Sequence, residues 1–309
     1  FADLNAHLVA VEAWFGRPPH GDALDVTMAA WTPGSYLIRE YCRHVQDVSA
    51  HDEDGRALKV HKVDKATWRV VLAATTTRVC VRYAVYGYDL TVRSNHIDDT
   101  HVFLNGAPTY LWCEVHRDAP VEIVIEAPQG WHVATGLSRH GAGFRARGVD
   151  ELIDSPIHIA PQPLFTFEAA GKPVHLALWG RPLGKIGIEE LVGDMANVIE
   201  THARVFGGVP YDDYTFVLML SPNAYGGLEH KNSCALLSSP FAFANRDKYE
   251  ELLELISHEF FHLWNVKRIR PQPLGPFAYD REAYTSALWM MEGITSYYDR
   301  YTLVRAKLE

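Results

Sequence analysis

The sequence predicts a chain of two parts, in which an all-β N-terminal domain is followed by a domain that mixes strands and helices. Short runs of alternating or β-branched residues recur through the first half of the chain. Long segments with helical periodicity occur only in the second half. Because side chains alternate along a strand but recur at about every 3.6 residues along a helix, the change of period indicates a change of architecture.

The first half is predicted to form a β sandwich or an open sheet. Turn-forming residues separate its apolar runs, as in Asp52-Glu53-Asp54-Gly55 and Pro128-Gln129-Gly130. Many short strands with frequent turns are typical of such folds. The strands are expected at residues 7–13, 24–30, 68–72, 77–83 and 121–126, in a domain that covers residues 1–171.

The pattern changes near Gly171-Lys172-Pro173, and a second domain is expected over residues 172–309. Two of its helices have recognisable ends, because Pro271 follows one and Asp280 is the expected N-cap of another. The expected strands are 174–179, 214–220 and 233–239, and the expected helices are 187–206, 248–269 and 281–306.

Composition excludes several classes of partner. The 309 residues are 48% hydrophobic and 22% charged with a formal net charge of -9, which is typical of a globular protein and provides no basic surface for nucleic acid. No apolar run reaches 18 residues, so no membrane span is expected. Because the chain starts at Phe1 and ends at Glu309 within a helical pattern, we expect it to be part of a longer protein.

The four cysteines are expected to be free thiols. None belongs to a CxxC pair, so their spacing supports neither a disulfide framework nor a cysteine zinc site. Free thiols are typical of a reducing compartment, and a cytoplasmic location is therefore expected. The cysteines are Cys42, Cys80, Cys113 and Cys234.

The sharpest signal for chemistry is the motif His258-Glu259-Phe260-Phe261-His262, inside a predicted helix. Residues four apart share a helix face, so both imidazoles can point at one zinc ion. Zinc lowers the pKa of a bound water towards about 7, and a carboxylate base such as Glu259 then helps that water to attack a carbonyl. The motif predicts metal-assisted hydrolysis.

A catalytic zinc usually takes three protein ligands, and Glu292 is the best candidate for the third. It lies 30 positions after His262, in the apolar stretch Trp289-Met290-Met291-Glu292-Gly293-Ile294-Thr295. A charge in such a stretch needs a partner. A salt-bridged core carboxylate is the alternative, but the nearby histidine pair favours zinc ligation.

A second segment of interest, Gly226-Gly227-Leu228-Glu229-His230-Lys231, falls between two predicted strands. Glycines let a backbone approach a ligand closely, and Glu229 could bind the free ammonium group of a peptide. On the residues alone, a surface turn with a solvated carboxylate is the favoured interpretation. His230 could donate to an oxyanion or orient Glu229, or it could make a structural hydrogen bond. Other histidines, such as His96 and His101, lack ligand spacing on a convincing element and are expected to be surface or core residues.

With these residues assembled, the chain resembles the glycyl aminopeptidase family of gluzincin metallopeptidases, over nearly its whole length. The signatures are Trp31 to Glu40 (WTPGSYLIRE), Gly227-Leu228-Glu229-His230, and His258 to Pro271 (HEFFHLWNVKRIRP). The last is much more specific than a bare HExxH motif. The Trp31–Glu40 segment marks the family, but its residues indicate no chemistry beyond a turn.

The resemblance implies a β-rich domain followed by a thermolysin-like catalytic domain. It implies zinc bound by His258, His262 and Glu292, with Glu259 as general base and acid. The chain is also similar to a wider group of aminopeptidases, in which a Gly-x-x-Glu loop binds the substrate's amine. This similarity favours Glu229 as the anchor for the amine, with Gly227 and His230 beside it. The family is bacterial, usually carries a PDZ domain, and by its name prefers glycine or alanine at the substrate N-terminus.

The expected function is therefore a zinc-dependent aminopeptidase acting on peptides, whose backbone would lie along an exposed edge at residues 233–239. A thermolysin-type endopeptidase is one alternative. A non-catalytic peptide-binding module is another, because the oxyanion tyrosine of related enzymes would fall beyond Glu309. Thermolysin has an aspartate four positions after its glutamate ligand, where this sequence has Ser296. A hydroxyl of Ser296 or Thr295 is thus a candidate to orient an imidazole.

Overall fold

The computed structural model describes residues 4–309 and divides the chain into two compact units. The first contains the described residues up to Gln129, together with Leu137–Ile157 and Phe277–Glu282. The second contains Gly130–Gly136, His158–Pro276 and Ala283–Glu309. The division into domains at residues 171 and 172 stays a prediction.

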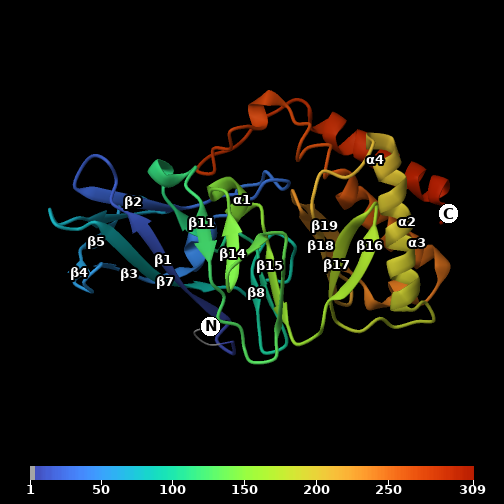
Figure 1. Cartoon of the computed structure of the whole chain (residues 1–309), viewed down its shortest axis with the longest axis horizontal. Helices are drawn as coiled ribbons and strands as arrows, with labels where there is room; N and C mark the ends of the chain where they lie inside the picture. Colours follow the sequence, from blue (N-terminus) through green and yellow to red (C-terminus); the bar gives the residue numbers. More distant parts are fainter. Residues whose placement is uncertain (1–3) are drawn as a thin grey trace. The chain divides into compact units, whose positions relative to one another are not determined.

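The first unit is built from antiparallel sheets and one short helix (Figure 1), as the sequence predicts. One sheet has the strand order β1-β7-β3-β4, a second has β10-β2-β6-β5, and a third has β11-β14-β13, while β8 and β9 form a hairpin. The elements are β1 (Leu8–Gly16), β2 (Ala23–Met28), η1 (Tyr41–His44), β3 (Val45–Asp52), β4 (Ala57–Leu58), β5 (Val60–Lys62), β6 (Thr67–Val71), β7 (Arg78–Tyr86), β8 (His96–Ile97), β9 (Val102–Leu104), β10 (Leu111–Trp112), η2 (Glu114–His116), β11 (Val121–Ile123), β13 (Ser138–His140), β14 (Gly143–Ala146) and α1 (Val149–Ile153).

Alternation of side chains gives each main sheet one buried face. On β2, Leu24, Val26 and Met28 are buried, and on the neighbouring β6 the buried residues are Trp68 and Val70. Side chains two residues apart point to the same face of a strand, so this pattern of sequence alone fixes which face packs inward.

The Trp31 signature segment has a structural role that the sequence did not indicate. Trp31 is completely buried, and its indole Nε1 donates to Ala278 O at 3.0 Å. Ala30 N donates to Tyr279 O at 2.7 Å, and the Trp31 ring contacts Phe277 edge-on at 5.7 Å. These contacts hold a segment from late in the sequence within the first unit, and the carbonyl of Ala278 satisfies the buried indole N–H of Trp31.

The second unit contains a five-stranded sheet with the order β16-β17-β18-β20-β19. The three central strands are parallel, and both outer strands run antiparallel to their neighbours. The elements are β12 (His132–Thr135), β15 (Ile157–Ala160), β16 (Phe165–Ala169), β17 (Lys172–Trp179), α2 (Ile188–Phe206), β18 (Tyr214–Leu220), β19 (Gly226–Glu229), β20 (Ser233–Ser238), η3 (Pro240–Phe243), α3 (Arg246–Phe261), η4 (Gln272–Leu274) and α4 (Leu288–Ala306).

One expectation about this sheet is wrong. Residues 233–239 were expected to form an exposed edge, but β20 lies between β18 and β19. The outer strand is β19, which contains Gly227 and Glu229 and was expected to be a turn. Its two glycines obscured the strand pattern, because glycine weakens the signal for a strand.

Helices α2 and α3 pack on one face of this sheet and form its core. The inward side chains recur at every second position of the strands and at helical spacing along the helices. The completely buried members are Val174, Leu176, Leu191, Met195, Val198, Ile199, Tyr214, Phe216, Leu218, Cys234, Leu236, Phe243, Tyr249, Leu253, Ile256, Phe260 and Leu263.

The helix boundaries differ from the prediction at two places. Helix α3 is capped by the Asn245 side chain, which accepts from Lys248 N, and it ends at Phe261 and not at Ile269. Val266 has a φ of 125°, which no helix accommodates. Helix α4 begins at Leu288, with Ala287 as its N-cap in place of Asp280. Apolar spacing continued across both turns, so periodicity alone extended the helices too far.

The four cysteines are free and buried. Among the residues that the structure describes, no helix combines the length and the apolar character needed to cross a bilayer.

We predict that Phe216→Ala lowers the free energy of unfolding by about 3–5 kcal/mol, because it removes a completely buried ring from the centre of the sheet. Phe241→Ala is the matched control: that ring is 54% exposed, so a change of about 0.5 kcal/mol or less is expected. Chemical denaturation of both variants measures the difference. Equal losses would contradict the assignment of the core.

Candidate metal centre and peptide site

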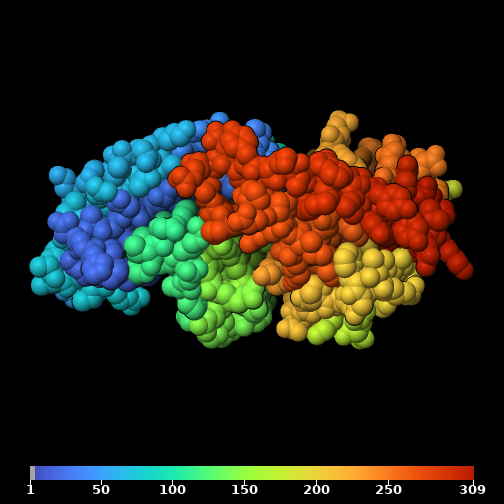
Figure 2. Space-filling view, turned by 90° about the horizontal axis from the view of Figure 1, so that it is seen from above, coloured from blue at the N-terminus to red at the C-terminus, as the bar shows by residue number. Residues whose placement is uncertain are grey.

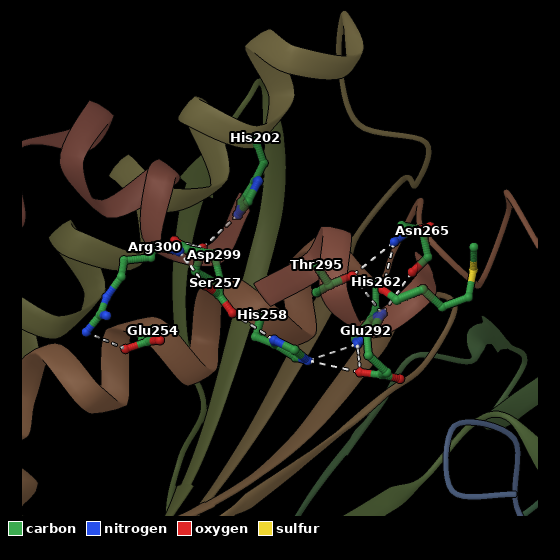
Figure 3. Close-up of polar contacts among 11 residues, drawn as sticks. His202, Glu254, Ser257, His258, His262, Asn265, Glu292, Thr295, Asp299 and Arg300 are labelled. Atoms are coloured by element: carbon green, nitrogen blue, oxygen red, sulfur yellow. Dashed lines mark hydrogen bonds and ion pairs between the residues drawn. The ribbon is translucent and has the colours of Figure 1, made fainter. Parts of the chain in front are cut away.

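Helices α3 and α4 bring the three predicted ligands together (Figure 3). His258 lies in the last turn of α3 and His262 is its C-cap residue, while Glu292 lies in the first turns of α4. The two Nε2 atoms are 3.1 Å apart, and Glu292 Oε2 is 3.5 Å from each of them. Three ligand atoms therefore form a nearly equilateral triangle.

The dimensions of this triangle fit zinc. Two ligands at about 2.0–2.1 Å from a tetrahedral ion are about 3.3 Å from each other. The observed separations of 3.1 Å and 3.5 Å lie on either side of that value. Two imidazoles and one carboxylate are also the donor set of many catalytic zinc sites, in which a fourth position stays open.

Both imidazoles are held from behind by acceptors. His258 Nδ1 donates to Asp299 Oδ2 at 2.8 Å, and His262 Nδ1 donates to Asn265 O at 2.8 Å. A hydrogen bond at Nδ1 fixes the tautomer and the ring plane, so that both Nε2 lone pairs can face the same point.

The electrostatics of the site favour a cation. Although burial opposes its protonation, hydrogen bonds to Asp299 and Glu292 raise the pKa of His258 to about 10. Burial likewise opposes ionisation of Glu292, but its contacts with His258 and His262 lower the pKa of this carboxyl to about 2. The carboxylates thus attract positive charge to the Nε2 atoms. Metal binding there would release protons and would weaken at low pH.

Glu259 and Glu229 form a second cluster with His262, in which the ligand atoms lie within 4.8 Å of one another. Glu259 projects from α3, whereas Glu229 is the last residue of the edge strand β19. Both are nearly buried, with exposures of 6% and 5%. Burial raises the pKa of Glu259 to about 7, since water solvates its charge poorly there.

Gly227 allows this approach of strand to helix. A Cβ atom at Gly227 would overlap the carboxylate of Glu259, so only glycine leaves room for that side chain. The next turn is equally enclosed: His230 is completely buried, and its backbone N–H donates to Ser233 O at 2.9 Å. The interpretation of Glu229 as a solvated carboxylate on a surface turn is therefore wrong.

The alternative interpretation of Glu292 as a salt-bridged core carboxylate is wrong. The Glu292 side chain is 50% exposed, and Trp289 in the same apolar stretch is 74% exposed. Figure 2 shows α4 in red at the viewed surface of the molecule. Apolar residues around a charge did not indicate burial here, because α4 turns only one narrow side, with Met291, Thr295 and Asp299, inward.

Asp299 and Asn265 are the functional residues that sequence reasoning missed. Asp299 is 3% exposed and lies seven positions after Glu292, which is two helical turns and therefore the same face of α4. That spacing could have identified it. Asn265 could not be found so, because it lies in the turn after α3 that the sequence predicted to be helical.

Of the two hydroxyl candidates, only Thr295 reaches the site. Thr295 Oγ1 lies 3.4 Å from His262 Nδ1 and accepts from Asn265 Nδ2 at 3.0 Å. Ser296 is exposed. The role of orienting an imidazole, for which Ser296 was a candidate, is taken by Asp299. Asp299 accepts from His258, whereas Thr295 lies beside His262.

A buried polar chain connects Asp299 to the interior of the unit (Figure 3). Ser257 Oγ donates to the backbone carbonyl of Asp299 at 2.9 Å and accepts from His202 Nε2 at 2.9 Å. Burial lowers the pKa of His202 to about 3, so this imidazole is neutral. These hydrogen bonds join α2, α3 and α4. They thereby fix the position of His258 on α3 relative to Glu292 on α4.

Comparison with known protein families identifies both parts of the sequence. Residues 1–161 match the model of the peptidase M61 N-terminal domain, and residues 251–309 match that of the M61 glycyl aminopeptidase. The chain belongs to the M61 glycyl aminopeptidase family. This is a family of metallopeptidases, and the resemblance stated from the sequence is confirmed.

Solved structures agree with the family assignment. The chain is 34% identical to an aminopeptidase N family protein from Idiomarina loihiensis, with a TM-score of 0.94 over 99% of this chain and 54% of that one. The chain thus spans about half of that protein. A point mutant of the M1 zinc metallopeptidase from Deinococcus radiodurans is 14% identical, with a TM-score of 0.51 over 96% of this chain and 66% of that one, and shows a shared fold. A search of curated protein sequences finds no match.

We predict that Asp299→Asn weakens zinc binding by about 10–100-fold, because the neutral amide no longer holds the His258 imidazole as an anionic acceptor does. Competition with a chromogenic chelator measures the affinity without any assay of activity. The control is Glu254→Gln, which removes a carboxylate of α3 that pairs with Arg300 rather than with His258. Equal affinity in the two variants would argue against the role of Asp299.

We also predict that Gly227→Ala displaces the Glu259 carboxylate. The kcat for peptide hydrolysis should fall at least about 10-fold while zinc is retained. Gly193→Ala is the control, because a Cβ at that position of α2 meets no neighbour and should stabilise the helix by about 0.5–1 kcal/mol. Zinc content and kcat of both variants are compared. Normal turnover in Gly227→Ala would show that the strand can withdraw without consequence.

Proposed function

We propose that this chain carries the active site of a zinc-dependent aminopeptidase, which hydrolyses the first peptide bond of peptides that begin with glycine or alanine. The observation that supports it is the cluster of Glu229, Glu259 and His262, which shares His262 with the ligand triangle. A proton acceptor and a buried anion thus lie beside one metal centre, and an aminopeptidase requires both.

His258, His262 and Glu292 would hold the ion. Zinc bound there would polarise the scissile carbonyl and lower the pKa of water to about 7. Glu259 is the base: its carboxylate takes a proton from the attacking water and passes it to the leaving amine. Its burial supports this role, since the raised pKa brings proton uptake and release into the neutral range.

Glu229 is the proposed anchor for the substrate's ammonium group. A nearly buried carboxylate beside Glu259 repels its neighbour and is stabilised by a cation, which a peptide N-terminus supplies. The peptide backbone would extend along β19, which pairs with β20 on one side and has no second strand partner within residues 4–309. Strand addition at such an edge supplies backbone hydrogen bonds while leaving the first residue at Glu229.

The endopeptidase alternative shares the metal centre but requires no anchor, and burial of Glu229 is the observation against it. The non-catalytic alternative is disfavoured because Glu259 is present and placed beside His262. A bacterial source, an associated PDZ domain, a cytoplasmic location and a domain boundary between residues 171 and 172 remain part of this proposal.

The test compares free and N-acetylated peptides in wild type and Glu229→Ala. Truncating one partner of a buried charge pair costs about 2–5 kcal/mol, so kcat/KM for glycyl and alanyl peptides should fall by at least about 30-fold. Acetylated peptides should be poor substrates for both proteins, with little change between them. Glu259→Gln provides the companion measurement, with turnover abolished and zinc retained. Equal losses on free and acetylated peptides would favour the endopeptidase, and turnover in Glu259→Gln would remove the base.

A further inference from the structure

The β8–β9 hairpin of the first unit gathers His96, Asp98 and His101 on one face. His96 pairs with Phe103, and Ile97 pairs with Val102, so the connecting loop is Asp98 to His101. Asp98 N donates to His101 O at 3.1 Å, which places these two residues opposite each other. Because side chains alternate along a strand, His96 and Asp98 share a face, and His101 joins them from across the turn.

The donor atoms of these side chains converge. His96 Nδ1 lies 2.8 Å from His101 Nε2 and 4.0 Å from Asp98 Oδ2. The three ligand atoms all lie within 4.8 Å of one another. His101 is completely buried and His96 is 7% exposed, whereas the Asp98 side chain is 22% exposed and gives solvent a way in. Both histidines are core residues, which was one of the two expected placements, but the expectation that they lack ligand spacing is wrong because the hairpin brings their ring nitrogens together.

The turn itself orients the Asp98 carboxylate. Its Oδ1 atom accepts from Thr100 N at 2.8 Å, Thr100 Oγ1 at 2.7 Å and His101 N at 2.9 Å. These bonds leave Oδ2 as the atom that faces His96. Backbone and hydroxyl donors behind a carboxylate fix its direction, as they do behind the ligands of known metal sites.

The imidazole of His96 is also held in place. Tyr88 stacks on it with ring centroids 5.2 Å apart and an interplanar angle of 23°. The ring of His7 stacks in turn on Tyr88, with ring centroids 3.7 Å apart. His7 Nδ1 donates to Ile97 O at 2.6 Å. Tyr88, itself held by His7, thus restricts rotation of the His96 ring, so less side-chain entropy remains to be lost on binding a ligand.

We propose that His96, Asp98 and His101 bind a divalent transition-metal ion of zinc type, at a site separate from the His258, His262 and Glu292 centre. Two imidazoles and one carboxylate suit such ions, whereas calcium and magnesium prefer oxygen alone. The contact of 2.8 Å between the two ring nitrogens would open to about 3.3 Å around a tetrahedral ion, and Asp98 Oδ2 would close by a similar amount. Small side-chain rotations accomplish both.

The site is local to one hairpin, so the ion acts structurally. It joins the two strands across the Asp98–His101 loop and stabilises the folded state, because the unfolded chain does not preform the site. Of the clusters found among residues 4–309, this one shares no residue with the other two, which both contain His262. Binding here is therefore measurable after the other centre is removed.

The experiment uses the full chain with His258→Ala and His262→Ala, stripped of metal and titrated with Zn²⁺ by calorimetry and with Co²⁺ by visible absorption. One equivalent of each ion is expected. Adding Asp98→Asn should weaken binding by at least about 10-fold, because it removes the anionic ligand but keeps an oxygen that accepts the turn hydrogen bonds. Asp99→Asn is the matched control: the same change at an exposed neighbour in the same loop should leave binding unaltered.

His101→Ala should abolish binding, and circular dichroism of the metal-free variant checks its fold. Should that variant not fold, X-ray absorption of the Co²⁺-loaded Asp99→Asn protein gives the ligands directly, with two imidazoles expected. No bound ion, equal affinity in Asp98→Asn and Asp99→Asn, or a Co²⁺ shell without imidazole nitrogen would each overturn the proposal. The cluster would then be a hydrogen-bonded histidine pair. None of these outcomes depends on peptidase activity.

Discussion

The packing of α3 against the five-stranded sheet and α4 is the constraint on which the candidate active site depends. Phe260 and Ile256 are completely buried in the core of the sheet, so the opposite side of α3 presents His258 and, one turn later at the C-cap, His262, while Glu259 lies between the two sides. A helix face is fixed once its apolar stripe is fixed. The packing of α3 therefore directs both histidines toward the same point. Helix α4 then places Glu292 within 3.5 Å of their Nε2 atoms.

Hydrogen bonds behind the ligands convert this placement into a defined geometry. Asp299 on α4 and the carbonyl of Asn265 hold the two Nδ1 atoms, so both Nε2 atoms face Glu292. The abrupt end of α3 is part of the same arrangement, because Asn265 leaves the helical path and donates to Met291 O and Thr295 Oγ1 on α4. In a longer α3 the Asn265 carbonyl would point along the helix axis toward the N–H four residues later, and it would not face His262 Nδ1. The end of the helix thus serves the site and not only the chain reversal.

The two histidine–carboxylate clusters illustrate different routes from sequence to geometry. The His258, His262 and Glu292 centre combines a helical repeat with a residue from a second helix, and it depends on tertiary packing. The His96, Asp98 and His101 cluster lies within a single hairpin, whose register places all three on one face. A helical motif is recognised by its fixed spacing, whereas a hairpin motif is recognised only when the turn and the register are known. For that reason the sequence alone does not reveal the second cluster, although its residues are close in sequence.

The sequence by itself determined the β-rich first part, the α+β second part, the family signatures and the His258, Glu259 and His262 motif, because periodicity and motif spacing are local properties. It also singled out Glu292 and Glu229, but not their surroundings. Only the tertiary structure decided that β19 and not β20 is the edge strand, that Glu229 is buried beside Glu259, and that Asp299 supports His258. Those facts follow from which surfaces pack together. Packing is decided by shape and by satisfied hydrogen bonds among residues far apart in the chain, and local patterns do not encode it.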